Sequence, residues 1–156
     1  MAEADPYVLA IIAPDRDDVR RLICASDCHL AALYPAKSNH VTDIAALASP
    51  GVSFLAALFA GEAVGCGALI RTRPSECELK RMFVAAAHRG SGLGRRILRA
   101  LEKIAGEEER VIRLETGVRQ PEAIALYRSA GFVEIAPFGS YAPDPLSLFM
   151  EKRVLK

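Results

Sequence analysis

The chain has 156 residues, of which 51% are hydrophobic and 25% are charged, and its formal net charge is +1. This balance predicts a single globular domain over residues 1–156 and excludes long disordered tracts. A charge this close to zero provides no general attraction to nucleic acid or to membrane surfaces, so we expect neither as a partner.

The N-terminal residues and the cysteines indicate in which cellular compartment the protein is expected. Residues 1–6 are acidic and lack the basic segment of a secretory signal, and no apolar run reaches membrane-spanning length. Cys24, Cys28, Cys66 and Cys77 lack the paired spacing of zinc ligands, so we expect no metal site and interpret them as small thiols in a reducing environment. We therefore expect a cytoplasmic protein.

Apolar runs bounded by proline, glycine and capping residues divide the first half of the chain into strands and helices. In chain order they predict a strand at 7–13, a helix capped by Asp15 and running to Tyr34, a short helix capped by Thr42 and ending at 48, and strands at 52–59, 63–73 and 76–84. Gly65 and Gly67, inside the strand at 63–73, predict a bulge or a close backbone approach.

The second half of the chain alternates helices and strands. The same signals predict a helix from Leu93 to about Gly106, a strand at 111–116, a helix from Pro121 to Gly131, and strands at 132–136 and 146–154. A stiff loop rich in proline, at 137–145, separates the last two strands. The predicted order of elements is therefore β-α-α-β-β-β-α-β-α-β-β.

Three glycines at every second position, Gly90, Gly92 and Gly94, connect the strand at 76–84 to the next helix. A glycine costs roughly 0.5–1 kcal/mol inside a helix or strand, so these residues more reasonably provide a backbone that another molecule can approach closely. The loop leads into a helix N-terminus, where unpaired N–H groups and the helix dipole attract anions, which predicts a phosphate or pyrophosphate site. A tight structural turn is the alternative, but one glycine usually suffices for that.

Two common phosphate motifs do not fit this loop. A dinucleotide fingerprint needs Gly-x-Gly-x-x-Gly, but the sixth position is Arg95 when counted from Gly90 and Ile97 when counted from Gly92. A nucleoside-triphosphate loop needs Gly-Lys-Ser/Thr, whereas Gly94 is followed by two arginines. Both nucleotide-binding classes are therefore excluded.

The pattern that fits is Arg89-x-x-Gly92-x-Gly94, followed in order by blocks at 114–117, 120–124 and 126–132. On these residues the chain resembles the GCN5-related N-acetyltransferase (GNAT) superfamily, most specifically from about Glu78 to Phe132. The resemblance implies an α/β fold whose mixed, mostly antiparallel sheet is flanked by helices. It also implies acetyl-CoA as cosubstrate, acetyl transfer to an amine, and a possible homodimer formed through the C-terminal strands.

The resemblance further implies which residues hold acetyl-CoA. They lie at the end of the strand at 76–84 and along the glycine loop: Met82, Phe83, Val84, Arg89, Gly90, Ser91, Gly92, Leu93, Gly94 and Arg95. Gln120 stands where many relatives carry an asparagine that contacts the pantetheine arm. Its side chain is longer, and a surface residue at a helix start accounts for it equally well.

Tyr127 matches the tyrosine with which the family protonates the departing coenzyme A thiolate. A phenol suits this role because it remains protonated at neutral pH, with a reference pKa of about 10. The alternative is an ordinary core aromatic residue, since Ile124, Tyr127 and Ala130 share one helical face.

Glu78 is the predicted general base, because charged residues in the first half of the strand at 76–84 indicate that this half lines an open cleft. Alternation places Glu78, Lys80 and Met82 on one face, and Leu79, Arg81 and Phe83 on the other. The alternative is a surface pair between Glu78 and Lys80.

For the acceptor we expect a small-molecule amine that carries a carboxylate, because several cations are predicted to converge at the mouth of the cleft. The expected acceptor contacts are Lys80, Arg81, Arg119 and Tyr141. Two rivals stay open at this point: a module that binds acyl-CoA without turnover, and a transferase of the same fold that uses another acyl group or a protein amine.

Overall fold

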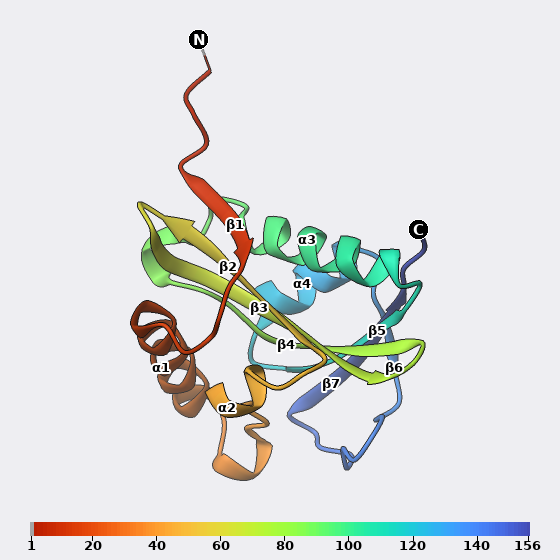
Figure 1. The fold of residues 1–156 in the computed structure, drawn as a ribbon. Coiled ribbons are helices and arrows are strands. Elements are labelled where there is room, and N and C mark those ends of the chain that lie inside the picture. The colour runs from red at the N-terminus through yellow and green to blue at the C-terminus, as the bar shows by residue number, and fades with distance from the viewer. Residues whose placement is uncertain (1) are drawn as a thin grey trace.

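The computed structural model describes residues 2–156, whose strands form one seven-stranded sheet (Figure 1). The helices and strands are β1 (Tyr7–Ile11), α1 (Asp17–Leu33), α2 (Ile44–Leu47), β2 (Val52–Phe59), β3 (Glu62–Arg73), β4 (Glu76–Val84), α3 (Leu93–Glu107), β5 (Val111–Gly117), α4 (Pro121–Ser129), β6 (Val133–Ile135) and β7 (Ser147–Arg153). Their spatial order in the sheet is β1-β2-β3-β4-β5-β7-β6. Only β4 and β5 are parallel neighbours, so the predicted mixed, mostly antiparallel sheet is confirmed.

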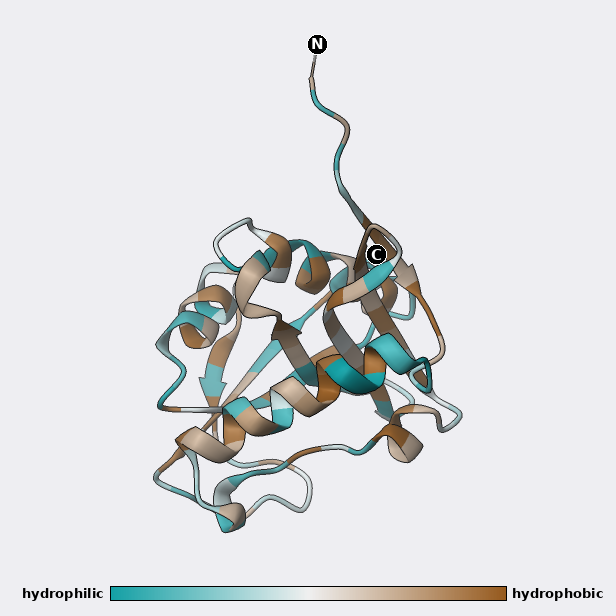
Figure 2. Cartoon of the chain, turned by 90° about the vertical axis from the view of Figure 1, so that its left-hand side faces the viewer, coloured by the Kyte–Doolittle hydropathy of each residue, from teal (hydrophilic) through white to brown (hydrophobic). Residues whose placement is uncertain are grey.

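Helices cover both faces of this sheet (Figure 1). On one face α3 and α4 bury an apolar cluster that includes Ile97, Leu101 and Tyr127, together with Leu79 of β4 and Leu114 of β5. On the other face α1 and α2 pack on a second cluster contributed mainly by β2 and β3. Figure 2 shows the corresponding pattern, with helices that mix hydrophilic and hydrophobic residues along their length and hydrophobic strands behind them.

Two of the predicted helix caps are wrong by one residue. The N-cap of α1 is Arg16 rather than Asp15, and its side chain makes no capping hydrogen bond. The cap of α2 is Asp43 rather than Thr42, because the Asp43 carboxylate accepts a hydrogen bond of 2.8 Å from the backbone N–H of Ala46. A carboxylate at this position satisfies one of the N–H groups that a helix start leaves unpaired.

The predicted irregularity at Gly67 is confirmed as a β-bulge. The pairing of β3 with β4 shifts there, so that Gly67 faces both Arg81 and Met82, and Arg81 adopts a left-handed φ of 58°. A Cβ on Gly67 would lie 2.6 Å from the sulfur of Met82 and 2.8 Å from a methyl carbon of Leu101. Only a glycine therefore allows α3 to pack this closely over the bulge.

The bulge also corrects the predicted faces of β4. Simple alternation placed Arg81 with Leu79, and Met82 with Glu78 and Lys80. In the structure Met82 packs on the α3 side, while the Arg81 side chain bonds to α1 on the opposite side, which Lys80 also faces. The extra residue of the bulge thus turns two consecutive cationic side chains toward the same face.

The most important feature for function is a separation between β4 and β5. The two strands pair from Glu76 with Val111 to Leu79 with Leu114, and then diverge. From Lys80 onward the edge of β4 that faces β5 has no strand beside it. Within residues 2–156 no helix combines the length and the apolar character needed to cross a membrane.

Candidate active site

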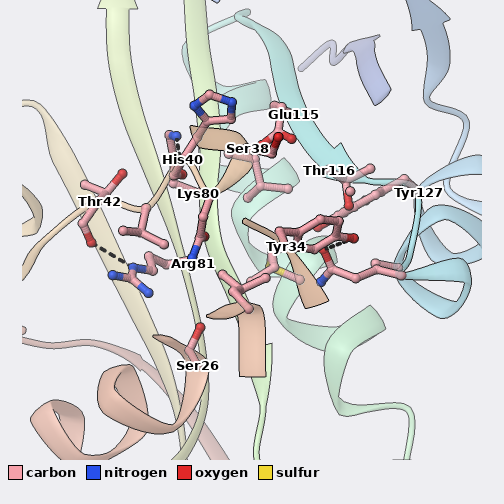
Figure 3. A pocket seen from close by; sticks show the side chains of 18 residues that line it. Ser26, Tyr34, Ser38, His40, Thr42, Lys80, Arg81, Glu115, Thr116 and Tyr127 are labelled. Carbon is pink, nitrogen blue, oxygen red and sulfur yellow. Dashed lines mark hydrogen bonds between the residues drawn. The ribbon is translucent and has the colours of Figure 1, made fainter. Parts of the chain in front are cut away.

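A cavity lies where β4 and β5 separate, and we call it the inner cavity (Figure 3). Tyr34, Thr116 and Tyr127 stand on one side of it, whereas His40, Lys80 and Arg81 stand on the other. Its walls come from α1, the α1–α2 connection, both diverging strands and α4 with its N-cap. Backbone groups of β4 are therefore available to a ligand that enters between the strands.

The glycine loop meets the requirements of a phosphate site. Gly90 and Gly92 have left-handed φ angles of 79° and 78°, and a Cβ on either residue would meet nothing within 4 Å. The Ser91 hydroxyl donates to the backbone oxygen of His88, so it does not cap α3. Within the described part of the chain, the N–H groups of residues 92–95 have no recorded acceptor. Open space and unpaired donors at a helix N-terminus fit a diphosphate.

Two arginines beside this loop carry charges that no carboxylate of residues 2–156 compensates. The Nε of Arg89 donates to the backbone oxygen of Val84 at 2.9 Å, and its guanidinium lies 5.3 Å from the centre of the Phe83 ring. Arg95 donates to the Ser129 hydroxyl at 2.8 Å. Among residues 2–156 neither arginine forms an ion pair with a carboxylate, so both cations can face an anionic ligand. The predicted coenzyme residues of the strand end and loop thus lie together.

Tyr127 lies in the wall of the inner cavity and is 6% exposed. Its ring contacts that of Phe132 edge-on, with centroids 5.7 Å apart. No hydrogen bond of its hydroxyl to another described residue is recorded. Burial raises the pKa of the phenol above its usual value, with a smaller contribution from the nearby Glu115 carboxylate. The side chain is both packed in the core and open to the cavity, so the two sequence-based interpretations are compatible.

Glu115 is a residue of this site that the sequence interpretation missed as a candidate base. Alternation along β5 buries Ile112 and Leu114 toward α3 and turns Glu115 to the opposite face, where it lines the inner cavity. Burial raises the pKa of this carboxyl. The available signal was the single acidic residue of the predicted strand at 111–116, because a charge buried in a sheet is costly when it is unpaired.

The predicted base, Glu78, lies in a neighbouring cluster instead. The Tyr141 hydroxyl donates to the Glu78 carboxylate, and the Lys80 ammonium donates to the Tyr141 oxygen at 2.7 Å. Lys80 also lies 3.6 Å from Glu78. Glu78 and Tyr141 line a second cavity, the outer cavity, which shares His40, Val41 and Lys80 with the inner one. Glu78 therefore pairs with Lys80, but the two side chains are only 14% and 16% exposed, so the pair is not the expected surface pair. Its role as a base stays a prediction.

Comparison with known proteins identifies the family. The model of the acetyltransferase (GNAT) family matches residues 18–132. The chain belongs to the GNAT family. It is 49% identical over 144 residues to the IAA acetyltransferase of Azospirillum brasilense, covering 90% of this chain and 93% of that protein. It is 31% identical over 128 residues to the uncharacterized N-acetyltransferase YsnE of Bacillus subtilis, covering 80% and 85% of the two chains.

A solved structure agrees in fold. The putative acyl-CoA N-acyltransferase of Klebsiella pneumoniae superposes with a TM-score of 0.80 at 37% identity, covering 96% of this chain and 98% of that one. The chain is thus an acetyl-CoA-dependent N-acetyltransferase with the GNAT fold. In this GNAT fold, the open glycine loop and the free edge of β4 suit the diphosphate and the pantetheine arm respectively.

Gln120 lies at the N-cap of α4 and lines the inner cavity, but its amide is already engaged. The Tyr34 hydroxyl donates to the Gln120 side-chain oxygen at 3.3 Å and accepts the backbone N–H of Arg119 at 3.0 Å. Within residues 2–156 no hydrogen bond of the amide nitrogen is recorded. A pantetheine contact through this nitrogen stays a prediction.

The predicted convergence of cations is only partly present. Arg81 is buried and donates to the backbone oxygen of Thr42 at 2.7 Å and to the Asp27 carboxylate, so it ties β4 to α1 and to the α1–α2 connection. Arg119 lines neither cavity, because its guanidinium donates to the backbone oxygen of Leu33. Lys80 is thus the cation of this predicted group that remains at the junction of the cavities.

Proposed function

We propose that this enzyme transfers the acetyl group to the primary amine of a small molecule that carries a carboxylate, directly within a ternary complex. The observation that carries the proposal is the inner cavity, where Tyr127 and Glu115 lie beside the free edge of β4. A small acceptor is also supported by the name of the Azospirillum relative, an IAA acetyltransferase.

Binding and orientation fall to backbone groups. When bound, acetyl-CoA supplies an acetyl group activated as a thioester. The N–H groups at the start of α3, with Arg89 and Arg95, would hold the diphosphate end, and the unpaired edge of β4 from Lys80 to Val84 would hold the arm. Positioning of this kind contributes to catalysis because it removes the entropy cost of bringing the reactants together.

Two side chains then move protons. Glu115, whose pKa is raised mainly by burial, accepts a proton from the ammonium form of the acceptor, which leaves a nucleophilic amine. Tyr127 donates its hydroxyl proton to the departing sulfur, and the second proton, which the nitrogen loses as the amide forms, restores the phenol. Its raised pKa keeps the hydroxyl protonated until that step. Glu78 is the second candidate for the base, because it lies beside Lys80 at the junction of the cavities.

The cysteines support direct transfer over a covalent acyl-enzyme. None of the four lines the inner cavity. Burial raises the pKa of Cys66 to about 12 and that of Cys77 to about 11, which suppresses their thiolate forms. Cys24 and Cys28 are exposed on α1.

The proposal is tested by following free thiol release from acetyl-CoA with and without an amine pool, in the wild type and in Tyr127→Phe. We expect release that depends on the amine in the wild type. The variant should bind acetyl-CoA normally and lose about 10²–10⁴-fold in kcat, the usual cost of removing a general acid. Binding without any amine-dependent release would favour the rival reading as a binding module, and an unchanged rate in Tyr127→Phe would limit this tyrosine to packing.

A further inference from the structure

The outer cavity is large enough to hold the body of an acceptor. Its volume is about 700 Å³, against about 100 Å³ for the inner cavity. The former value lies in the range of about 300–1,000 Å³ typical of small-molecule sites. The two cavities adjoin at His40, Val41 and Lys80, which line both of them. Lys80 donates there to the backbone oxygen of His40 at 3.2 Å and to the Tyr141 hydroxyl at 2.7 Å, so a molecule that extends its reactive end from the outer cavity into the inner one passes this cluster.

One wall of the outer cavity is aromatic and fixed in place. Phe138 and Tyr141 line it and form a three-ring cluster with the buried Phe149, with centroids 5.2–5.8 Å apart. The loop that carries the first two rings is fastened by Asp144, whose carboxylate accepts the Ser38 hydroxyl at 2.6 Å. A preformed aromatic wall favours a flat apolar group, since little ordering entropy is lost when such a group binds.

The far end of the outer cavity offers a cation. Arg113 contacts Glu76 at 3.0 Å and Glu151 at 3.1 Å, so its charge is compensated. Arg73 lines the same cavity, but its side chain is 75% exposed and reaches Glu76 only at 4.0 Å. Its guanidinium is therefore free to form the bidentate contact that arginine makes with carboxylates.

The two ends of the cavity lie well apart. Arg73 pairs in register with Glu76, and Lys80 follows four residues later on β4. At about 3.3 Å per residue, the strand advances roughly 13 Å over this interval. The flexible Arg73 side chain can extend into the cavity and shorten this distance. A carboxylate bonded next to the carbon that carries the reacting amine would still not reach the Arg73 guanidinium.

We propose that the outer cavity binds an acceptor whose amine and carboxylate lie at opposite ends of a flat apolar body. The carboxylate contacts Arg73, the body lies against Phe138 and Tyr141, and the amine enters the inner cavity past Lys80. This inference rests on the proposed function and makes it specific: the site selects against α-amino acids, in which the two groups are adjacent.

The test is a binding measurement that needs no turnover. Calorimetry with the protein saturated with coenzyme A compares three probes: 4-(aminomethyl)benzoate, its neutral carboxamide and phenylalanine. We expect the benzoate to bind about tenfold or more tightly than either of the others, as a charge-assisted contact implies. In Arg73→Gln this preference for the benzoate over the carboxamide should disappear, and in Phe138→Leu both of these probes should weaken together.

Arg99→Gln is the matched control, because Arg99 is exposed on α3 and lines neither cavity. It should keep the full preference for the benzoate. Absence of benzoate binding, equal binding of the benzoate and the carboxamide, or an unchanged preference in Arg73→Gln would each overturn the inference. The proposed function is judged separately, by amine-dependent thiol release, so either idea can fail without the other.

Discussion

Glu115 and Glu78 face the same side of the sheet from neighbouring strands, yet their surroundings differ. Glu78 accepts from Tyr141 and lies next to Lys80, so its negative charge is compensated in the folded protein. Glu115 lines the inner cavity, where burial disfavours its ionised form. A carboxyl with a raised pKa is better suited to accept a proton near neutral pH, which is why we propose Glu115 as the base.

The pH dependence of kcat/KM distinguishes the two carboxyls. A base acts when ionised, so the rate should rise with pH through the pKa of Glu115, which lies above the usual value of about 4.3 for glutamate. In Glu115→Gln, kcat/KM should fall by about 10²–10⁴-fold and should no longer rise with pH over this range, so the low-pH limb of the profile is lost. Glu78→Gln serves as the matched variant and should retain the limb.

Loss of the limb in Glu78→Gln, with the limb intact in Glu115→Gln, would return the role to the residue that the sequence indicated. Sequence alone could not decide which of these two glutamates is the base. Both lie in strands with alternating charge. Their surroundings differ because the loop at 137–145 places the Tyr141 hydroxyl against Glu78, whereas Glu115 lines the inner cavity.

At the scale of elements, the glycine loop and the start of α3 form the part of the site that the sequence predicts best. Spacing of glycines, a strand before and an amphipathic helix after are all local features, and local features are visible in a single sequence. The structure adds that Gly92 is the N-cap of α3 and that its backbone is left-handed.

Gly92→Val should therefore weaken acetyl-CoA binding severely, because its side chain would fill space that is open in front of the unpaired N–H groups. Valine is also strained at a positive φ, so the variant needs a control for that effect. Gly61→Val provides it. Gly61 has a φ of 81° and no neighbour within 4 Å of its Cβ position, but it lies in the β2–β3 turn.

Calorimetric titration of acetyl-CoA into both variants, together with thermal unfolding, gives the comparison. We expect similar losses of stability and a loss of affinity only in Gly92→Val. Equal affinity in the two folded variants would remove the loop from the coenzyme site.

Other features depend on contacts between elements and were not predictable in detail. The bulge at Gly67 was foreseen as an irregularity, but the side to which Arg81 turns depends on Asp27 in α1 and on the backbone of Thr42. Likewise, the sequence predicts Arg119 at the acceptor site, whereas its guanidinium donates a hydrogen bond to the backbone oxygen of Leu33 at the end of α1. Such partners are far away in sequence, so periodicity carries no information about them.

At the scale of the whole molecule, the candidate active site lies where two neighbouring strands of the sheet stop pairing. Parallel pairing of β4 with β5 ends at Leu79 and Leu114, and the edge that becomes free borders the inner cavity. The α1–α2 connection and the loop at 137–145 meet over the same face, where Ser38 donates to Asp144. The resemblance to the family implied the sheet, whereas the meeting of these two loops followed only from the structure.

The central claim is that the acceptor is a small amine bearing a carboxylate. Its most direct test is a side-by-side measurement of kcat/KM for amines that carry a carboxylate, their amides, polyamines and lysine peptides, with acetyl-CoA and identification of the acetylated product by mass. We predict the highest kcat/KM for the free acids, because Arg73 lines the outer cavity and is available to a carboxylate. Preferential acetylation of the amides, the polyamines or the peptides would contradict the account.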